Sequence, residues 1–169
     1  MTQNNNGGGQ DRFRAVYERH APLVRAVLYN ICGGEHLDDL VQETFIKIWK
    51  GLPGFKENAN IKTWIYRIAT NTALDWCRKN ASAKMEHWLP DVPGGEGGEA
   101  NAIHRDIVKK CLLRLSPEQR AVVTLCVFEE LTVKEAATAL GLPEGTVKSR
   151  LHYARAEMGK FFQVNGVTV

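Results

Sequence analysis

The side chains best suited to a chemical task lie near the C-terminus, where small residues alternate with cations. Residues 143–158 carry apolar side chains at helical spacing, which predicts a helix with one buried stripe. This stripe consists of Val147, Leu151, Ala154 and Met158. Small residues on the opposite face would let the backbone approach base edges, and cations beside them could neutralise phosphates. The predicted DNA contacts are Gly145, Thr146, Lys148, Ser149, Arg150, His152, Tyr153 and Arg155.

The residues before this helix complete the layout of a helix-turn-helix. Thr132 and Glu135 are spaced as a capping box, which predicts a helix that starts at Thr132. Gly141 is suited to end that helix, and Pro143 is suited to the first turn of the next one. The motif favours DNA binding, although an amphipathic helix with a basic outer face can also be simply solvated.

A second candidate surface lies on the helix predicted over residues 37–52. Its outer face places Ile46 among acidic and amide side chains, with Trp49 at the margin. An apolar centre with a polar rim is typical of a protein-docking surface. A single exposed isoleucine on a solvated helix is the plainer interpretation. The predicted docking residues are Asp39, Gln42, Glu43, Ile46 and Trp49.

The helix predicted over about residues 60–79 carries a third candidate surface. Arg67, Asn71 and Arg78 fall on one line, at i, i+4 and i+11, beside an aromatic residue. Single-stranded nucleic acid needs cations for phosphate, an aromatic face for stacking and polar groups for base edges. The preceding loop, anchored by Phe55, could hold an extruded base, whereas a solvated face and a simple turn are the alternatives. The predicted contacts are Phe55, Lys56, Asn58, Asn60, Thr63, Tyr66, Arg67, Asn71 and Arg78, and Thr70 and Leu74 lie on the same outward face.

No constellation of residues predicts an enzyme or a metalloprotein. The sequence has no nucleophile–base pair, metal-ligand cluster or phosphate-binding loop, so no cofactor is expected. His20, Cys32 and His36 could form a zinc site, but their spacing fits no familiar ligand pattern. The four cysteines are far apart in the sequence and form no CxxC pair, so we expect buried, inert thiols in a reduced cytoplasm. They are Cys32, Cys77, Cys111 and Cys126.

Composition places the chain among ordinary globular proteins. Its 169 residues are 44% hydrophobic and 24% charged, with a net charge of +3. Residues 11–80 hold 11 basic and 8 acidic residues, and residues 102–169 hold 10 and 7, whereas residues 81–101 hold one and four. Two weakly basic ends joined by an acidic connector suggest two contacts with a polyanion. No apolar run approaches the roughly 20 residues that a membrane span needs, and the N-terminus has no signal peptide, so a cytoplasmic location is expected.

The sequence predicts an all-α protein of two small helical domains joined by a flexible linker. Residues 1–10 form a polar, glycine-rich tail that we expect to be disordered, and residues 164–169 form a second tail. Residues 11–80 form the first domain, and residues 102–163 form the second, which contains the helix-turn-helix. Residues 81–101 between them hold two prolines and four glycines, which is typical of a linker.

Four segments, in order, resemble the conserved regions of bacterial sigma factors. They read HLDDLVQETFIKIWK, TWIYRIATNTALDW, LSPEQRAVVTL and LTVKEAATALGLPEGTVKSRLHYARAE. The small size and two-domain layout resemble the extracytoplasmic-function (group IV) subfamily of the sigma-70 family. The resemblance covers about residues 12–160.

The resemblance implies a transcription factor that directs an enzyme without being one. Residues 11–80 would be sigma region 2, which docks on the clamp helices of the largest catalytic subunit of RNA polymerase. The same region would melt and read the −10 element. Residues 102–163 would be region 4, which reads the −35 element and meets the β flap, while the linker would run near the RNA exit path. An anti-sigma factor is an expected partner, the free protein is expected to be a monomer, and no small-molecule substrate is implied.

Two other classes of protein compete with this interpretation. A stand-alone helix-turn-helix regulator, with a helical sensing or dimerisation domain, would read palindromic half-sites about one DNA turn apart. A nucleic-acid-modifying enzyme would need paired carboxylates or metal ligands at usable spacing, which the sequence lacks.

Overall fold

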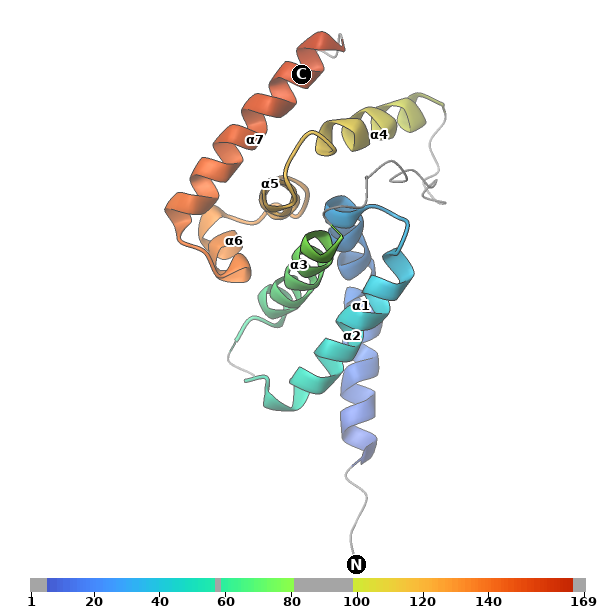
Figure 1. Cartoon of the computed structure of the whole chain (residues 1–169). Coiled ribbons are helices and arrows are strands. Elements are labelled where there is room, and N and C mark those ends of the chain that lie inside the picture. Colours follow the sequence, from blue (N-terminus) through green and yellow to red (C-terminus); the bar gives the residue numbers. More distant parts are fainter. Residues whose placement is uncertain (1–5, 57–58, 81–98, 166–169) are drawn as a thin grey trace, which may run out of the picture.

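The computed structural model describes residues 6–56, 59–80 and 99–165, and every regular element in these ranges is helical (Figure 1). The predicted all-α class is therefore confirmed for the described part of the chain. None of its helices is both long and apolar enough to cross a bilayer.

The N-terminal unit is a bundle of three long helices. These are α1 (Asn6–Cys32), α2 (Leu37–Gly51) and α3 (Ile61–Lys79), with a short 3₁₀ turn, η1 (Leu52–Gly54), after α2. Asn60 begins α3, because its side-chain oxygen accepts hydrogen bonds from the amides of Lys62 and Thr63 at 2.9 and 3.2 Å. The bundle core includes Val24, Val27, Leu28, Ile31, Leu40, Phe45, Ile48, Ile65, Ala69 and Ala73.

The C-terminal unit consists of shorter helices followed by one long one. They are α4 (Glu99–Leu112), α5 (Pro117–Val123), a π-helical turn η3 (Thr124–Phe128), α6 (Val133–Leu140) and α7 (Glu144–Val164). Thr132 and Glu135 form the predicted capping box before α6. Gly141 ends α6 with a φ of 65°, a left-handed conformation that favours glycine. The predicted helix-turn-helix is thus α6–α7.

Three predicted boundaries differ from the structure. Helix α1 begins at Asn6, although residues 1–10 were expected to be a disordered tail, and residues 1–5 lie outside the described residues. Extending a helix that Phe13 and Val16 already anchor costs less than starting a new one. Helix α4 begins at Glu99, inside the predicted linker, of which residues 81–98 lie outside the described ranges. Val164 still belongs to α7, and residues 166–169 of the predicted C-terminal tail are not described.

The two units pack directly against each other. Helix α3 contacts α5 and α6, and α1 contacts α5 and η3, so α3 lies between α2 and α6 (Figure 1). Buried residues of both units form one continuous hydrophobic core. The side chain of Arg120, in α5, is only 1% exposed within this packed region.

Candidate protein and nucleic-acid interfaces

The outer face of α2 presents an apolar centre to solvent. Ile46 and Trp49 are 46% and 43% exposed, and the acidic and amide side chains around them are also exposed. Beside them lies a groove of about 500 Å³, shared between α1 and α2. Its lining residues are Phe13, Tyr17, Arg25, Asp38, Val41, Gln42, Phe45, Ile46 and Trp49. The structure thus has the apolar centre and polar rim that the sequence predicted for a docking surface, and the docking role stays a prediction.

Two aromatic residues of α1 extend this surface and were missed by the sequence analysis. The ring of Phe13 meets Trp49 edge-on at a centroid distance of 4.9 Å, and the ring of Tyr17 lies 4.6 Å from that of Phe45. Their spacing at i and i+4 within the predicted helical domain was the available signal, because such residues share one face of a helix.

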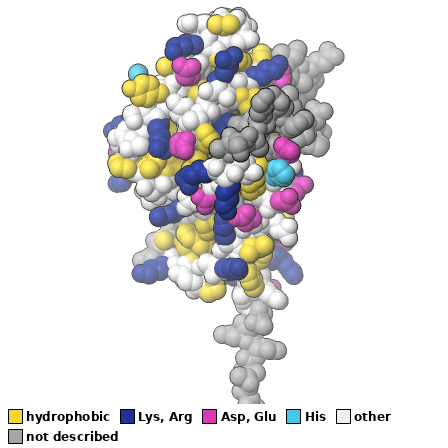
Figure 2. Space-filling view, viewed as in Figure 1, with side chains coloured by type: hydrophobic (Ala, Val, Ile, Leu, Met, Phe, Trp, Pro, Cys, Tyr) yellow, Lys and Arg dark blue, Asp and Glu magenta, His cyan; other side chains and the backbone are white. Residues whose placement is uncertain are grey.

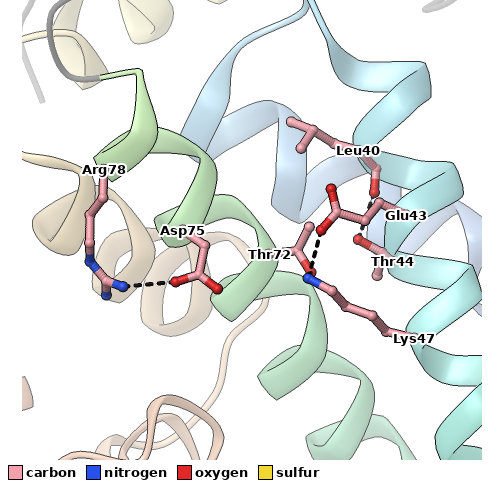
Figure 3. A network of polar contacts seen from close by, with 7 residues as sticks. All are labelled: Leu40, Glu43, Thr44, Lys47, Thr72, Asp75 and Arg78. Carbon is pink, nitrogen blue, oxygen red and sulfur yellow. Dashed lines mark hydrogen bonds and ion pairs between the residues drawn. The ribbon is translucent and has the colours of Figure 1, made fainter.

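Polar side chains of α2 make contacts within the helix and one contact with α3. Lys47 forms an ion pair with Glu43 at 2.7 Å and donates a hydrogen bond to the Thr72 hydroxyl at 3.0 Å (Figure 3). The buried hydroxyl of Thr44 donates to the carbonyl oxygen of Leu40 at 2.7 Å. The hydrogen bond from Lys47 to Thr72 therefore joins the helix of the predicted docking face to α3.

The outer face of α3 keeps its predicted row of polar residues. Arg67, Asn71 and Arg78 are all exposed. Arg78 forms an ion pair with Asp75 at 2.8 Å, and the two side chains are 64% and 52% exposed (Figure 3). Exposed ion pairs contribute little free energy, so a phosphate could replace Asp75 at the guanidinium. The role of the row in binding nucleic acid stays a prediction.

Three residues expected on the outside of α3 are buried instead. Tyr66 is 1% exposed and Thr70 is fully buried, as is most of Leu74. Helices α5 and α6 pack against α3, and the Tyr66 hydroxyl donates a hydrogen bond to Glu129 Oε2 at 2.6 Å. Burial, together with Glu129, raises the pKa of Tyr66. The expectation of an exposed aromatic face beside the row is therefore wrong for this arrangement, because long-range packing decides burial here.

The loop before α3 is anchored as predicted, but one of its polar side chains is engaged. The ring of Phe55 packs on that of Trp64 at a centroid distance of 5.0 Å. Asn60 caps α3 through its side-chain oxygen, while Lys56 is exposed. Asn58 lies outside the described residues, and Thr63 is half-buried.

The face of α7 that the sequence predicts to contact DNA is open to solvent. Gly145, Lys148, Ser149, His152 and Arg155 are exposed, and Tyr153 is 63% exposed, whereas Thr146 and Arg150 are half-buried. The opposite stripe packs into the core, as predicted, with Val147, Leu151 and Ala154 buried and Met158 partly so. Basic and acidic side chains are interspersed on the face seen in Figure 2. Among the described residues, this face therefore carries no single broad basic field.

The three residues considered for a zinc site are not grouped as metal ligands in the structure. No cluster of three or more histidine, cysteine or acidic side chains suited to a metal ion occurs among the described residues, which include His20, Cys32 and His36. Burial and the nearby Arg19 and Lys62 lower the pKa of His20. All four cysteines are free thiols, and two of them, Cys32 and Cys77, are in contact.

Comparisons with known proteins show the family to which the chain belongs. The family model of sigma-70 region 2 matches residues 16–83, and that of sigma-70 region 4 matches residues 105–158. The ECF RNA polymerase sigma factor SigL of Mycobacterium tuberculosis is 31% identical over 168 residues, which cover 92% of this chain and 91% of SigL. The chain belongs to the ECF sigma factors of the sigma-70 family.

Two further relatives place this ECF sigma factor in its family. SigE of Mycolicibacterium smegmatis is 32% identical over 85% of this chain, which spans 58% of the length of that relative. A co-crystal structure of the sigma factor RpoE with the anti-sigma factor NepR from Bartonella quintana has a similar fold. The TM-score is 0.74 at 26% identity, over 90% of this chain and 98% of RpoE. Sigma factors are transcription initiation factors, and the match to region 2 argues against a stand-alone helix-turn-helix regulator.

Proposed function

We propose that this ECF sigma factor binds core RNA polymerase and directs it to promoters with specific −10 and −35 elements. It acts in the cytoplasm as a specificity factor and catalyses no reaction itself. The observation that carries the proposal is the coexistence of an exposed apolar docking face on α2 with two separate polar faces, on α3 and α7. The chain matches sigma-70 regions 2 and 4 at these same elements.

The docking face meets the clamp helices of the largest polymerase subunit. Ile46 and Trp49 supply the apolar centre, and Asp39, Gln42 and Glu43 supply the rim. An exposed apolar anchor inside a polar rim is the arrangement in which a few side chains dominate binding energy. The C-terminal unit makes a second contact, with the β flap.

The α3 face and the loop before it read the melted −10 element. Arg67 and Arg78 neutralise phosphates, while Asn71 presents an amide to unpaired base edges. Tyr66 joins this face only when the C-terminal unit moves away, because in the structure it is covered. The other residues proposed to contact the −10 element are Phe55, Lys56, Asn58, Asn60 and Thr63.

The α7 face reads the double-stranded −35 element in the major groove. Ser149 and His152 stand opposite the buried stripe and are placed to meet bases, whereas Arg150 and Arg155 flank them and are placed to meet phosphates. Gly145 leaves the start of the helix without a side chain, and nothing in the described chain lies within 4 Å of the place that a Cβ would take, so DNA can approach closely there.

An anti-sigma factor holds the protein inactive. The RpoE of similar fold was crystallised with the anti-sigma factor NepR. A protein that covers the α2 groove would block polymerase docking directly, because Ile46 and Trp49 line that groove.

Binding to core polymerase tests the proposal through a single substitution. Ile46→Asp should weaken binding by about 2 kcal/mol or more, roughly thirtyfold, because it removes an apolar anchor and introduces a charge that must be desolvated. Analytical ultracentrifugation with core polymerase measures the change. Val164→Asp is the matched control, since Val164 is 87% exposed and lies far along α7. Equal affinity of the Ile46→Asp variant and the parent would refute the docking assignment.

A further inference from the structure

Two cysteines that are distant in the sequence lie side by side in the fold. Cys32 is the last residue of α1 and Cys77 is near the end of α3, and their Sγ atoms are 3.9 Å apart. A disulfide has an S–S distance of about 2.05 Å, so the two sulfurs need to approach by roughly 2 Å. Gly33, with a φ of 85°, follows Cys32 directly and ends α1, so the adjustment falls at a helix terminus.

The two thiols differ in how readily they ionise. The hydrogen bond from Cys32 lowers the pKa of Cys77 to about 7, and Arg120 of α5 acts in the same direction, while burial and Glu118 oppose them. The same hydrogen bond, together with burial, raises the pKa of Cys32. Cys77 therefore ionises more readily than Cys32, so any thiolate of the pair is carried by Cys77. A nucleophilic thiolate beside a resolving thiol is typical of redox-active cysteines.

We propose that Cys32 and Cys77 form a redox-active pair that a peroxide oxidises to a disulfide. The Cys77 thiolate attacks one peroxide oxygen, the O–O bond breaks, and Cys77 becomes a sulfenic acid while hydroxide leaves. The Cys32 thiol gives its proton to that hydroxide, and its sulfur attacks Cys77 Sγ. The S–O bond breaks, the S–S bond forms, and the second hydroxide takes up a proton as water. The two thiols lose two electrons in total, and the peroxide is reduced to two waters.

Oxidation also acts on the contact between the two units. Arg120 belongs to the C-terminal unit and faces Cys77 of the N-terminal unit. A disulfide carries no negative charge, so its formation removes one favourable electrostatic contact of a buried guanidinium. We therefore expect oxidation to weaken the contact between the two units and to make the α3 face around Tyr66 more accessible. This consequence does not depend on the proposed role in transcription.

Peptide mapping after peroxide treatment tests the pair in the full-length chain. We expect hydrogen peroxide to join the Cys32 and Cys77 peptides, with Cys111 and Cys126 still reduced, because burial raises the pKa of both of these thiols. In the Cys32→Ser variant, Cys77 should accumulate as a sulfenic acid that dimedone traps. In the Cys77→Ser variant, the remaining Cys32 should not react with the peroxide. Oxidation of all four cysteines at similar rates, or of none before unfolding, would overturn the proposal.

Two measurements test the coupling to the C-terminal unit. Small-angle scattering should give a larger radius of gyration for the oxidised chain than for the reduced one, and no difference in Cys32→Ser. Arg120→Gln should move the pH profile of Cys77 alkylation to higher pH, whereas Arg120→Lys, which keeps the charge, should move it less. Identical scattering of the two redox states would overturn the coupling, and an unshifted alkylation profile in a folded Arg120→Gln variant would overturn the role of Arg120.

Discussion

Several side chains at the proposed interfaces already have partners within the chain. Asn60 caps α3, Arg78 pairs with Asp75, and Ser149 donates a hydrogen bond to the carbonyl oxygen of Thr146 at 3.0 Å. Nucleic acid must therefore compete with these contacts, which are exposed and weak. Among the described residues, neither His152 nor Arg155 forms an ion pair. Substitutions of these two residues therefore give the clearest test of base reading and phosphate binding on α7.

Substitutions on α7 should separate base reading from phosphate binding. Arg155→Ala should weaken binding to all sequences alike and reduce the slope of log affinity against log salt by about one unit. His152→Ala should change the preferred −35 sequence by roughly 1–3 kcal/mol at one base position, with the salt slope kept. Selection from randomised −35 elements at several salt concentrations measures both quantities. If the His152 variant selects the parent sequence, His152 is not a base-reading residue.

The ionisation of Cys77 should make the stability of the reduced protein depend on pH. Because the pKa of Cys77 is lowered to about 7 in the folded state, the unfolded state binds more protons between pH 7 and its ordinary value near 9. The free energy of unfolding should therefore rise from pH 7 to pH 9 and lose this contribution as pH falls through 7. Above pH 9 the raised pKa of Cys32 acts in the opposite direction. Urea titrations of the parent and of Cys77→Ser measure the difference, and equal slopes in the two proteins would rule out a thiolate at Cys77.

At the scale of the elements, the turn between α5 and α6 positions the contact between the units. The π-helical turn η3 ends at Phe128, and Glu130 adopts a φ of 56°, which is uncommon for a residue other than glycine. The amide of Leu131 donates to the carbonyl oxygen of Leu125 at 2.9 Å, which closes the turn. This geometry directs Glu129 toward the Tyr66 hydroxyl on α3.

Removing the hydrogen bond between Tyr66 and Glu129 should weaken the packing of the two units against each other. Tyr66→Phe leaves Glu129 without the donor and should lower the free energy of unfolding by about 1.5–3 kcal/mol, the range for hydrogen bonds to charged groups. The radius of gyration should increase as well. Tyr153→Phe is the matched control, because the Tyr153 ring is 63% exposed. A Tyr66→Phe variant with parental stability and scattering would show that this bond does not hold the units together.

Local signals predicted much of the fold, and long-range packing accounts for what they missed. The capping box at Thr132 and the left-handed Gly141 depend on neighbouring residues alone, so the sequence located both ends of α6 within a residue. The burial of Tyr66 and the contact of Cys32 with Cys77 depend on residues more than 40 positions away along the chain. No helical periodicity could distinguish a face covered by another unit from a solvated one.

At the scale of the whole molecule, the packing of the two units against each other leaves only one of the two proposed DNA-binding faces fully accessible. The α7 face is exposed, whereas part of the α3 face lies under the C-terminal unit. Reading both promoter elements at once with all the proposed contacts therefore requires the units to part. Binding of core polymerase is expected to supply the free energy for this step, because polymerase engages each unit separately in the proposed function.

Transcription initiated by core polymerase tests the central claim most directly. Purified core polymerase, this protein and a library of promoter fragments with randomised −35 and −10 segments are combined, and the 5′ ends of the transcripts are sequenced. The account predicts transcripts that start at a fixed distance from one selected pair of elements and that disappear with Ile46→Asp. Arg67→Ala and Asn71→Ala should reduce transcription far more than binding to a duplex carrying the −35 element alone. Transcripts with no preferred elements, or the same products from core polymerase without this protein, would contradict the assignment as a promoter-specific sigma factor.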